Sequence, residues 1–171
     1  MDALLQLRHV ADDYAARPIA DAFNWQEASA ELGDGQWYLV AFRSVRKETA
    51  DEARLEAYDE RAHQEAAAAP GFVHYYKGPK ASDGSCLSFC LWTSRTEART
   101  ASGGPAHIEA VGLIAEMYER YTLEFHRVGR EAGGPLTFAP YDSPPMPVNE
   151  TPPDMPDAAR PTLALRPAPA S

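Results

Sequence analysis

The stretch WYLVAFRSV, residues 37–45, predicts a β-strand with apolar side chains on both of its faces. Successive side chains of a strand point to opposite sides of the sheet. One face therefore carries Trp37, Leu39, Ala41 and Val45, and the other carries Tyr38, Val40 and Phe42. Because apolar surface is stabilised by the exclusion of water, both faces of the sheet that contains this strand must be covered.

The segments that follow predict a ferredoxin-like order of elements. Capping boxes at Thr49-x-x-Glu52 and Ser94-x-x-Glu97 mark two helix starts, and Pro105 suits the first turn of a third helix. The predicted elements are strand 37–45, helix 49–69, strands 72–77 and 86–93, a short helix from 94, helix 105–120, strand 121–128 and a short edge at 136–139. This order is the split βαβ arrangement of the α+β class, with a four-stranded antiparallel sheet and the helices on one face.

The other face of the sheet also needs a cover, because strand 86–93 is apolar on both sides as well. Two covers are available in a chain of this size: N-terminal helices predicted at 2–16 and 25–32, or an identical subunit. We divide the chain into an N-terminal helical extension (1–35), a ferredoxin-like domain (36–142) and a proline-rich tail (143–171). The composition of the tail favours an extended or disordered state.

Length and charge limit the classes of function. The chain has 171 residues, enough for one domain with a core, and a net charge of −9. This charge argues against nucleic acid or an anionic membrane as a partner, and the sequence shows neither a signal peptide nor a membrane span, so we expect a cytoplasmic protein. Cys86 and Cys90 are four residues apart in one predicted strand, roughly 13 Å between Cα atoms. This distance is too long for a disulfide bond.

Residues 86–99, CLSFCLWTSRTEAR, and residues 104–110, GPAHIEA, resemble the Trp-x-Ser-x-x-Glu-Ala then His pattern of the dimeric α/β-barrel superfamily, especially its antibiotic-biosynthesis-monooxygenase-like branch. The resemblance covers about residues 36–130. It implies a homodimer in which two sheets pack face to face, with a hydrophobic small molecule held between sheet and helices. Chemistries of this superfamily include cofactor-free oxidation of aromatic polyketides, polyketide cyclisation, muconolactone isomerisation and haem-dependent reactions.

Two predicted helices place titratable side chains on the stripes that face the sheet. At about 100° per residue, Asp59 falls inside one stripe with His63 at its edge, and His107 falls inside another. Several members of these stripes are small, which leaves volume for a mostly apolar pocket. The stripes are Leu55, Tyr58, Ala62, Ala66 and Ala69 on the first helix, and Ile108, Val111, Ile114, Ala115 and Tyr118 on the second.

His107, Asp59 and His63 are candidates for acid–base chemistry. His107 lies in the first turn of its helix, where the helix dipole and free amides disfavour imidazolium, so a neutral general base is expected. Asp59 and His63 are one turn apart, so Asp59 can orient the His63 ring, or His63 can bind a metal with Asp59 beside it. The alternatives are a core histidine at 107 and a solvated pair at 59 and 63.

His74 and Tyr76 alternate on one face of strand 72–77. If this face meets the helices, both residues line the pocket of His107 and form a candidate acid and base for enolisation. If it points away, they belong to the contact with a second subunit. The sequence leaves both arrangements open.

Large side chains are candidates for substrate binding. Trp37 and Trp92 offer flat walls for an aromatic or polyprenyl ligand, with core packing as the alternative. Arg43 shares a face with Trp37 and needs an anionic partner, such as Asp59, another protomer or a substrate carboxylate, unless it reaches solvent. The residues assigned to substrate binding are Tyr76, Trp92, Trp37, Arg43 and Tyr118.

Together these features predict a small enzyme of specialised metabolism. It is expected to act by acid–base chemistry, without a cofactor, on a hydrophobic oxygenated molecule of polyketide or terpenoid type, as a monooxygenase or a cyclase/isomerase. The sequence has no phosphate-binding glycine loop, no HExxH motif and no GxSxG motif, and we assign no metal site. The alternatives are a non-catalytic dimeric protein that binds a small molecule or responds to stress, and a haem protein with a single axial histidine.

Overall fold

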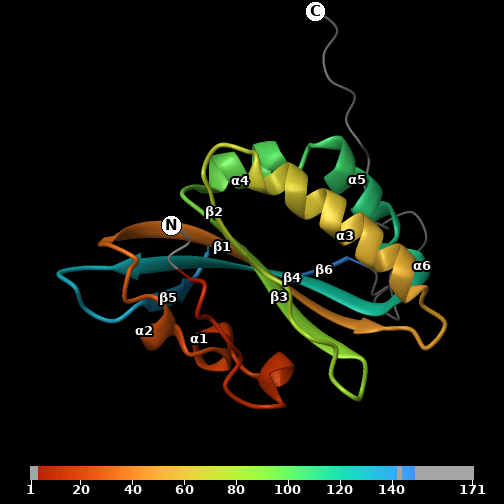
Figure 1. Cartoon of the computed structure of the whole chain (residues 1–171), viewed down its shortest axis with the longest axis horizontal. Helices are drawn as coiled ribbons and strands as arrows, with labels where there is room; N and C mark the ends of the chain where they lie inside the picture. Colours follow the sequence, from red (N-terminus) through yellow and green to blue (C-terminus); the bar gives the residue numbers. More distant parts are fainter. Residues whose placement is uncertain (1–3, 142–143, 149–171) are drawn as a thin grey trace, which may run out of the picture.

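The computed structural model describes residues 4–141 and 144–148, and within them the strands form one antiparallel sheet (Figure 1). The order across the sheet is β2-β3-β1-β4-β5, and β6 also pairs with β4. This arrangement of the first four strands is ferredoxin-like, so the predicted α+β class is confirmed. The strands are β1 (Gly35–Arg46), β2 (Phe72–Tyr76), β3 (Ser85–Trp92), β4 (Tyr118–Arg130), β5 (Thr137–Pro140) and β6 (Met146–Pro147).

Four helices lie on one face of this sheet (Figure 1). The predicted cap of α4 is confirmed, because the side chain of Ser94 accepts a hydrogen bond from the Glu97 amide. The predicted cap of α3 is wrong, because the Asp51 carboxylate lies closer to the helix and accepts from the Arg54 amide. The single helix predicted at 105–120 is divided and shorter, since the chain enters β4 at Tyr118. The helices are α3 (Glu52–Ala67), α4 (Arg95–Ala101), α5 (Pro105–Gly112) and α6 (Ile114–Met117).

The N-terminal segment, residues 4–32, covers the opposite face of the sheet (Figure 1). It contains a short 3₁₀ turn and two one-turn helices, α1 (Ile19–Ala22) and α2 (Trp25–Ala28). The long helix predicted at 2–16 is wrong over its described part, because this backbone bonds to the residues that follow it. Val10 donates to the Ala22 carbonyl, and His9 pairs with Phe23 in an isolated β-bridge.

Aromatic side chains form the contact between the N-terminal segment and the sheet. Phe23 and Trp25 pack on Phe89 of β3 with ring centroids 5.4 and 5.1 Å away, and Phe23 also meets Tyr76 of β2 at 4.8 Å. Of the two covers that the sequence left open, the described chain therefore supplies its own. A homodimer that joins two sheets face to face remains a prediction, and it now requires displacement of residues 4–32.

Two arginines of the sheet hold the N-terminal segment by its carbonyl groups. Arg43 of β1 donates to the carbonyls of Ala15 and Arg17, both at 2.6 Å, and pairs with Glu124 of β4. Arg130 of β4 donates to the carbonyls of Ser29 and Leu32 in the same way. The anionic partner that the sequence required for Arg43 is thus Glu124, and not Asp59.

Three further sequence predictions concern the two cysteines, membrane-spanning helices and the proline-rich tail. Cys86 and Cys90 are both free thiols in β3, as their spacing predicts. No helix in the described part of the chain combines the length and apolarity needed to cross a lipid bilayer. Most of the proline-rich tail, residues 143 and 149–171, lies outside the described residues.

Candidate functional site

The long helices over the sheet bury few of their own side chains. Leu55 is the buried residue among the 16 residues of α3, and α5 buries none of its residues. Beneath them, Cys90 of β3 and Tyr121 of β4 lie deep in the protein, yet each keeps part of its surface accessible to solvent. The volume predicted from the alanine stripe of α3, in the layer between the helices and the sheet, stays a prediction.

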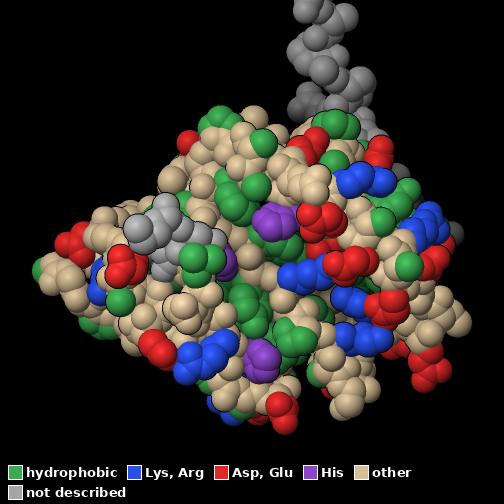
Figure 2. All heavy atoms as spheres, viewed as in Figure 1, with side chains coloured by type: hydrophobic (Ala, Val, Ile, Leu, Met, Phe, Trp, Pro, Cys, Tyr) green, Lys and Arg blue, Asp and Glu red, His purple; other side chains and the backbone are tan. Residues whose placement is uncertain are grey.

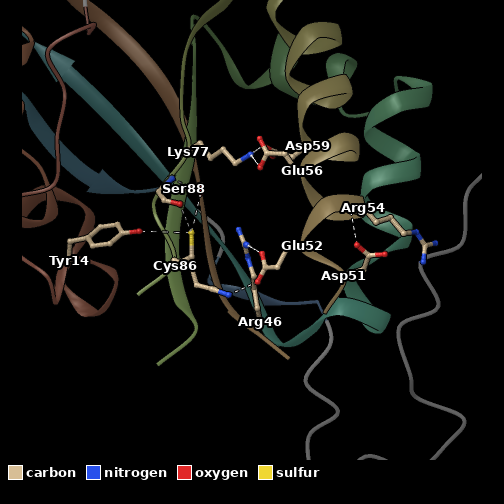
Figure 3. Close-up of polar contacts among 12 residues, drawn as sticks. Tyr14, Arg46, Asp51, Glu52, Arg54, Glu56, Asp59, Lys77, Cys86 and Ser88 are labelled. Atoms are coloured by element: carbon tan, nitrogen blue, oxygen red, sulfur yellow. Dashed lines mark hydrogen bonds and ion pairs between the residues drawn. The ribbon is translucent and has the colours of Figure 1, made fainter. Parts of the chain in front are cut away.

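A group of four side chains, connected by hydrogen bonds and ion pairs, joins α3 to β2 and the residue after it. The Tyr75 hydroxyl donates to Asp59 Oδ1 at 2.6 Å, and Lys77 Nζ lies 2.9 Å from Asp59 Oδ2. Lys77 also donates to Glu56 at 2.5 Å (Figure 3). Burial, and then the Asp59 carboxylate, raise the pKa of Tyr75 well above its usual value. Tyr75 is therefore a neutral phenol at physiological pH and keeps its proton for donation.

His63 lies next to this group but is not bonded to Asp59. Its ring packs on the Tyr75 ring at 4.9 Å between centroids and on the Phe72 ring at 6.1 Å. The hypothesis that Asp59 orients His63 therefore does not describe this geometry, because Tyr75 and Lys77 occupy the two oxygens of Asp59. Asp59 and His63 are four residues apart on one helix, which allowed a bond between them. In the structure Asp59 instead bonds to Tyr75 and Lys77.

His107 lies in the first turn of α5, where Glu65 of α3 caps the helix. The two oxygens of Glu65 accept from the amides of Ala106 at 3.3 Å and His107 at 3.0 Å. Burial lowers the pKa of the His107 imidazole, and the charge of Glu65 opposes this effect without cancelling it. The ring is thus neutral at neutral pH, the state expected from the sequence, and can accept a proton.

Two tyrosines and a thiol extend the polar floor of the layer. Tyr118 and Tyr121 of β4 meet edge to face at 5.0 Å, so Tyr118 belongs to the sheet and not to the helix stripe. Burial raises the pKa of Tyr121 well above its usual value, and burial with the charge of Asp59 raises that of Cys90 to about 12. Sequence reasoning missed Tyr75, Tyr121 and Cys90. Cys90 pairs with Val40, Tyr121 with Ser44 and Tyr75 with Cys90, so these strand pairings place the three side chains on the face under the helices.

Ion pairs close the layer on the side of the β2–β3 hairpin. Glu52 of α3 pairs with Arg46 of β1 and with Lys80 of the hairpin at 2.5 Å (Figure 3). Figure 2 shows acidic and basic side chains interleaved over this side of the molecule. Burial lowers the pKa of Arg46, but Tyr118 and Glu52 outweigh it and leave the pKa raised. A single carboxylate, that of Glu52, therefore serves two cations at this border.

His74 and Tyr76 lie on the other side of the sheet. A β-bulge separates Phe72 from His74, so Phe72 faces the helices and His74 faces the N-terminal segment. Tyr76 stacks on Phe89 at 5.8 Å on that same side. Of the two arrangements that the sequence left open, the structure has His74 and Tyr76 pointing away from the helices, so the sheet separates them from His107.

The other candidates for substrate binding divide between the two faces. Trp92 faces the helices and is buried against Phe72 and Ala98. Trp37 and Arg43 lie on the face covered by the N-terminal segment. Within residues 4–141 and 144–148, no group of three or more His, Cys, Asp and Glu side chains is placed to hold a metal ion.

These features define an α+β domain of ferredoxin-like topology, with a hydrogen-bonded group under its helices and a cover over its second face that belongs to the same chain. Residues 1–137 match the model of the PB2B2.08-like family, and the chain belongs to this family. Among curated proteins, no relative matches the sequence.

Several solved structures are similar to this chain over a little more than half of its length. SnoaB, a cofactor-independent oxygenase from Streptomyces nogalater, is 20% identical over 58% of this chain and 95% of its own, with a TM-score of 0.43. Rv0793 from Mycobacterium tuberculosis is 19% identical over 56% and 98%, with a TM-score of 0.47. A dimeric ferredoxin-like protein of unknown function from Thermobifida fusca is 16% identical over 56% and 92%, with a TM-score of 0.45.

Proposed function

We propose that this protein is a small enzyme that binds a hydrophobic, oxygenated molecule under α3 and α5 and acts on it by acid–base chemistry. The observation that carries the proposal is the bond between Tyr75 and Asp59 at 2.6 Å, held in a deep layer with accessible surface. A neutral phenol in such surroundings can donate to an oxygen that gains negative charge during a reaction. Lys77 supports this role, because it holds Asp59 in place as the partner that orients Tyr75.

The reaction class that fits these groups is removal of a proton from carbon next to a carbonyl group. In the proposed step the C–H proton passes to the neutral ring of His107, and the electron pair moves to the carbonyl oxygen. The single O–H of Tyr75 leaves Asp59 and turns to this oxygen as it gains negative charge. The resulting enolate can add to an internal carbonyl, as in a cyclase, or give up electrons to dissolved O₂, as in a cofactor-independent oxygenase. In the second case the hydroperoxide formed loses water and leaves a quinone.

Anthrone is a suitable probe, because its CH₂ group is acidified by a carbonyl conjugated with it through the rings, as a CH₂ group next to a carbonyl is, and its oxidation by O₂ gives anthraquinone and water. We expect the protein to accelerate both anthraquinone formation, followed by absorbance, and O₂ uptake. Tyr75→Phe and His107→Gln should each lower the rate by at least about tenfold. Tyr76→Phe is the matched control, since Tyr76 lies on the same strand but stacks on Phe89 on the opposite face of the sheet, and it should keep the wild-type rate.

The results separate the proposal from its alternatives. Wild-type rates in the Tyr75→Phe and His107→Gln variants would remove these residues from the chemistry and overturn the assignment. Saturable binding of anthrone without turnover would instead favour the non-catalytic binding protein. Circular dichroism and thermal unfolding of each variant show whether a loss of rate reflects a loss of fold.

A further inference from the structure

Helix α5 lies beside α3 and buries none of its eight residues, although most of them are apolar (Figure 1). The elements before and after it are anchored in the core. Ala98 of α4 is buried beside Trp92, and Leu113 and Met117, which follow α5, are buried against Leu55 of α3. Helix α5 is therefore a weakly anchored segment between two anchored ones.

Glycine residues lie at both ends of α5. Gly112 is the last residue of the helix and comes directly before the buried Leu113. A Cβ atom at Gly112 would have no atom of the described residues within 4 Å, so the backbone is not packed against a neighbour at this point. At the other end, Gly103 and Gly104 connect α4 to α5. Because glycine adopts the widest range of backbone angles, the chain can bend at both ends of α5 while α4 and α6 stay in place.

Polar contacts to α3 hold α5 in its position. The carboxylate of Glu65 accepts hydrogen bonds from the amides of Ala106 and His107, and Arg61 pairs with Glu109 at 3.1 Å. The two side chains of this ion pair are 50% and 57% exposed, so solvent screens their attraction. A segment held by polar contacts, with few buried apolar ones, separates from its neighbours more readily than the core does.

The sheet is covered less completely on the side of the helices than on the side of the N-terminal segment. Phe42 of β1 and its pairing partner Leu123 of β4 lie on the helix side, as does Phe125, and all three are only partly buried. On the opposite side of β1, Leu39 and Ala41 are completely buried. The helix layer is thus the less tightly closed of the two covers.

We propose that α5 is a lid, which bends at Gly103 and Gly112, moves away from α3 and so admits a ligand to the layer that holds Asp59 and Tyr75. Because His107 lies on α5, closure of the lid also returns the proposed base to the site. This inference rests on the function proposed above for the role of that layer. The movement itself is a property of the chain without a ligand and can be measured separately.

The test is a distance measurement between two spin labels on the full chain. Ala57→Cys on α3 and Ile108→Cys on α5 place the labels at exposed positions, in a background that carries Cys86→Ser and Cys90→Ser. We expect a longer distance, that of the open lid, beside the distance of the closed state. Labels at Ala57→Cys and Arg99→Cys, on α3 and the anchored α4, are the control pair and should give one distance.

Variants should shift the open population in opposite directions. Glu65→Ala removes the acceptor of two amides and should raise the share of the long distance at least about threefold. Gly112→Ala restricts bending and should lower this share about two- to fivefold. Glu60→Ala is the matched control, since Glu60 also lies on α3 but bonds to Gln64 of the same helix, and it should leave the distances unchanged. A single distance that Glu65→Ala does not change would overturn the lid.

Amide exchange of the unlabelled wild-type protein, followed by NMR, is a second measurement. A lid that moves as an intact helix exposes the amides of Ala106 and His107, which bond to α3, and keeps the amide of Val111 within its helix. The first two should exchange at least about tenfold faster than the third. Equal protection of all three would also overturn the lid. Neither measurement uses anthrone, so absence of turnover with a moving lid would count against the proposed function alone.

Discussion

Arg43→Met should release part of the N-terminal segment from the sheet. Arg43 donates to Glu124 and to the carbonyls of Ala15 and Arg17. The side chains of Arg43 and Glu124 are only 21% and 19% exposed, so methionine leaves a mostly buried carboxylate without its cation and two carbonyls without their donor. Exposed ion pairs contribute up to about 1 kcal/mol, and breaking a fully buried pair costs about 3–5 kcal/mol. For this intermediate case we expect the free energy of unfolding to fall by about 2–4 kcal/mol.

Urea denaturation followed by circular dichroism measures this change, and limited proteolysis shows whether residues 4–32 become cleavable. Arg8→Met is the matched control, because Arg8 pairs with Glu27 within the same segment but both side chains are 62% exposed. We expect the control to change stability by less than about 1 kcal/mol. In the double variant, Arg43→Met with Glu124→Gln, the free energy of unfolding should fall by less than the sum of the decreases in the two single variants. The reason is that the double variant no longer contains the unpaired carboxylate. Equal stability of Arg43→Met and Arg8→Met would refute the role of Arg43 in holding the segment.

Three further predictions concern titratable groups. Burial raises the pKa of Glu124, but His126 and Arg43 lower it more, so its contribution to stability is complete above the usual pKa of 4.5 and is lost as the pH falls below it. Urea midpoints between about pH 6 and pH 3 should fall more steeply in the wild type than in Arg43→Met, and parallel curves would contradict this. Because burial lowers the pKa of His107, its NMR titration midpoint should lie below the usual 6.5, and a midpoint at or above 6.5 would show that the ring is solvated. Since burial raises the pKa of the Cys90 thiol to about 12, Cys90 in the native protein should react far more slowly with Ellman's reagent at about pH 8 than it does once the chain unfolds. Equal rates in the native and unfolded protein would show that burial does not suppress the thiolate.

Part of the candidate site could be predicted from helix periodicity, and part could not. The position of Asp59 on the sheet-facing side of α3 and the neutral state of His107 both agree with the helix positions worked out from the sequence. The partner of Asp59 did not follow from periodicity, because helix spacing shows neighbours on the same helix and not side chains on the strand beneath. Tyr75 and Lys77 reach Asp59 only because β2 lies under α3.

The β-bulge in β2 is a second feature that periodicity in the sequence does not predict. Simple alternation places Phe72 and His74 on one face of a strand, and the extra residue between them moves them to opposite faces. A shift of one residue exchanges the faces of all side chains beyond it. The face of His74, and with it the choice between a pocket residue and a core residue, was therefore decided by strand pairing.

The sequence by itself determined the order of strands and helices, the two-sided apolar character of β1 and β3, and the start of α4 at Ser94. These features depend on residues close together in the chain, whose periodicity and capping groups act locally. Only the tertiary structure decided that residues 4–32 cover the second face of the sheet, that Glu124 neutralises Arg43, and that Tyr75 bonds to Asp59. Each of these contacts joins segments far apart in the sequence, where packing and desolvation select among partners that local patterns leave equivalent.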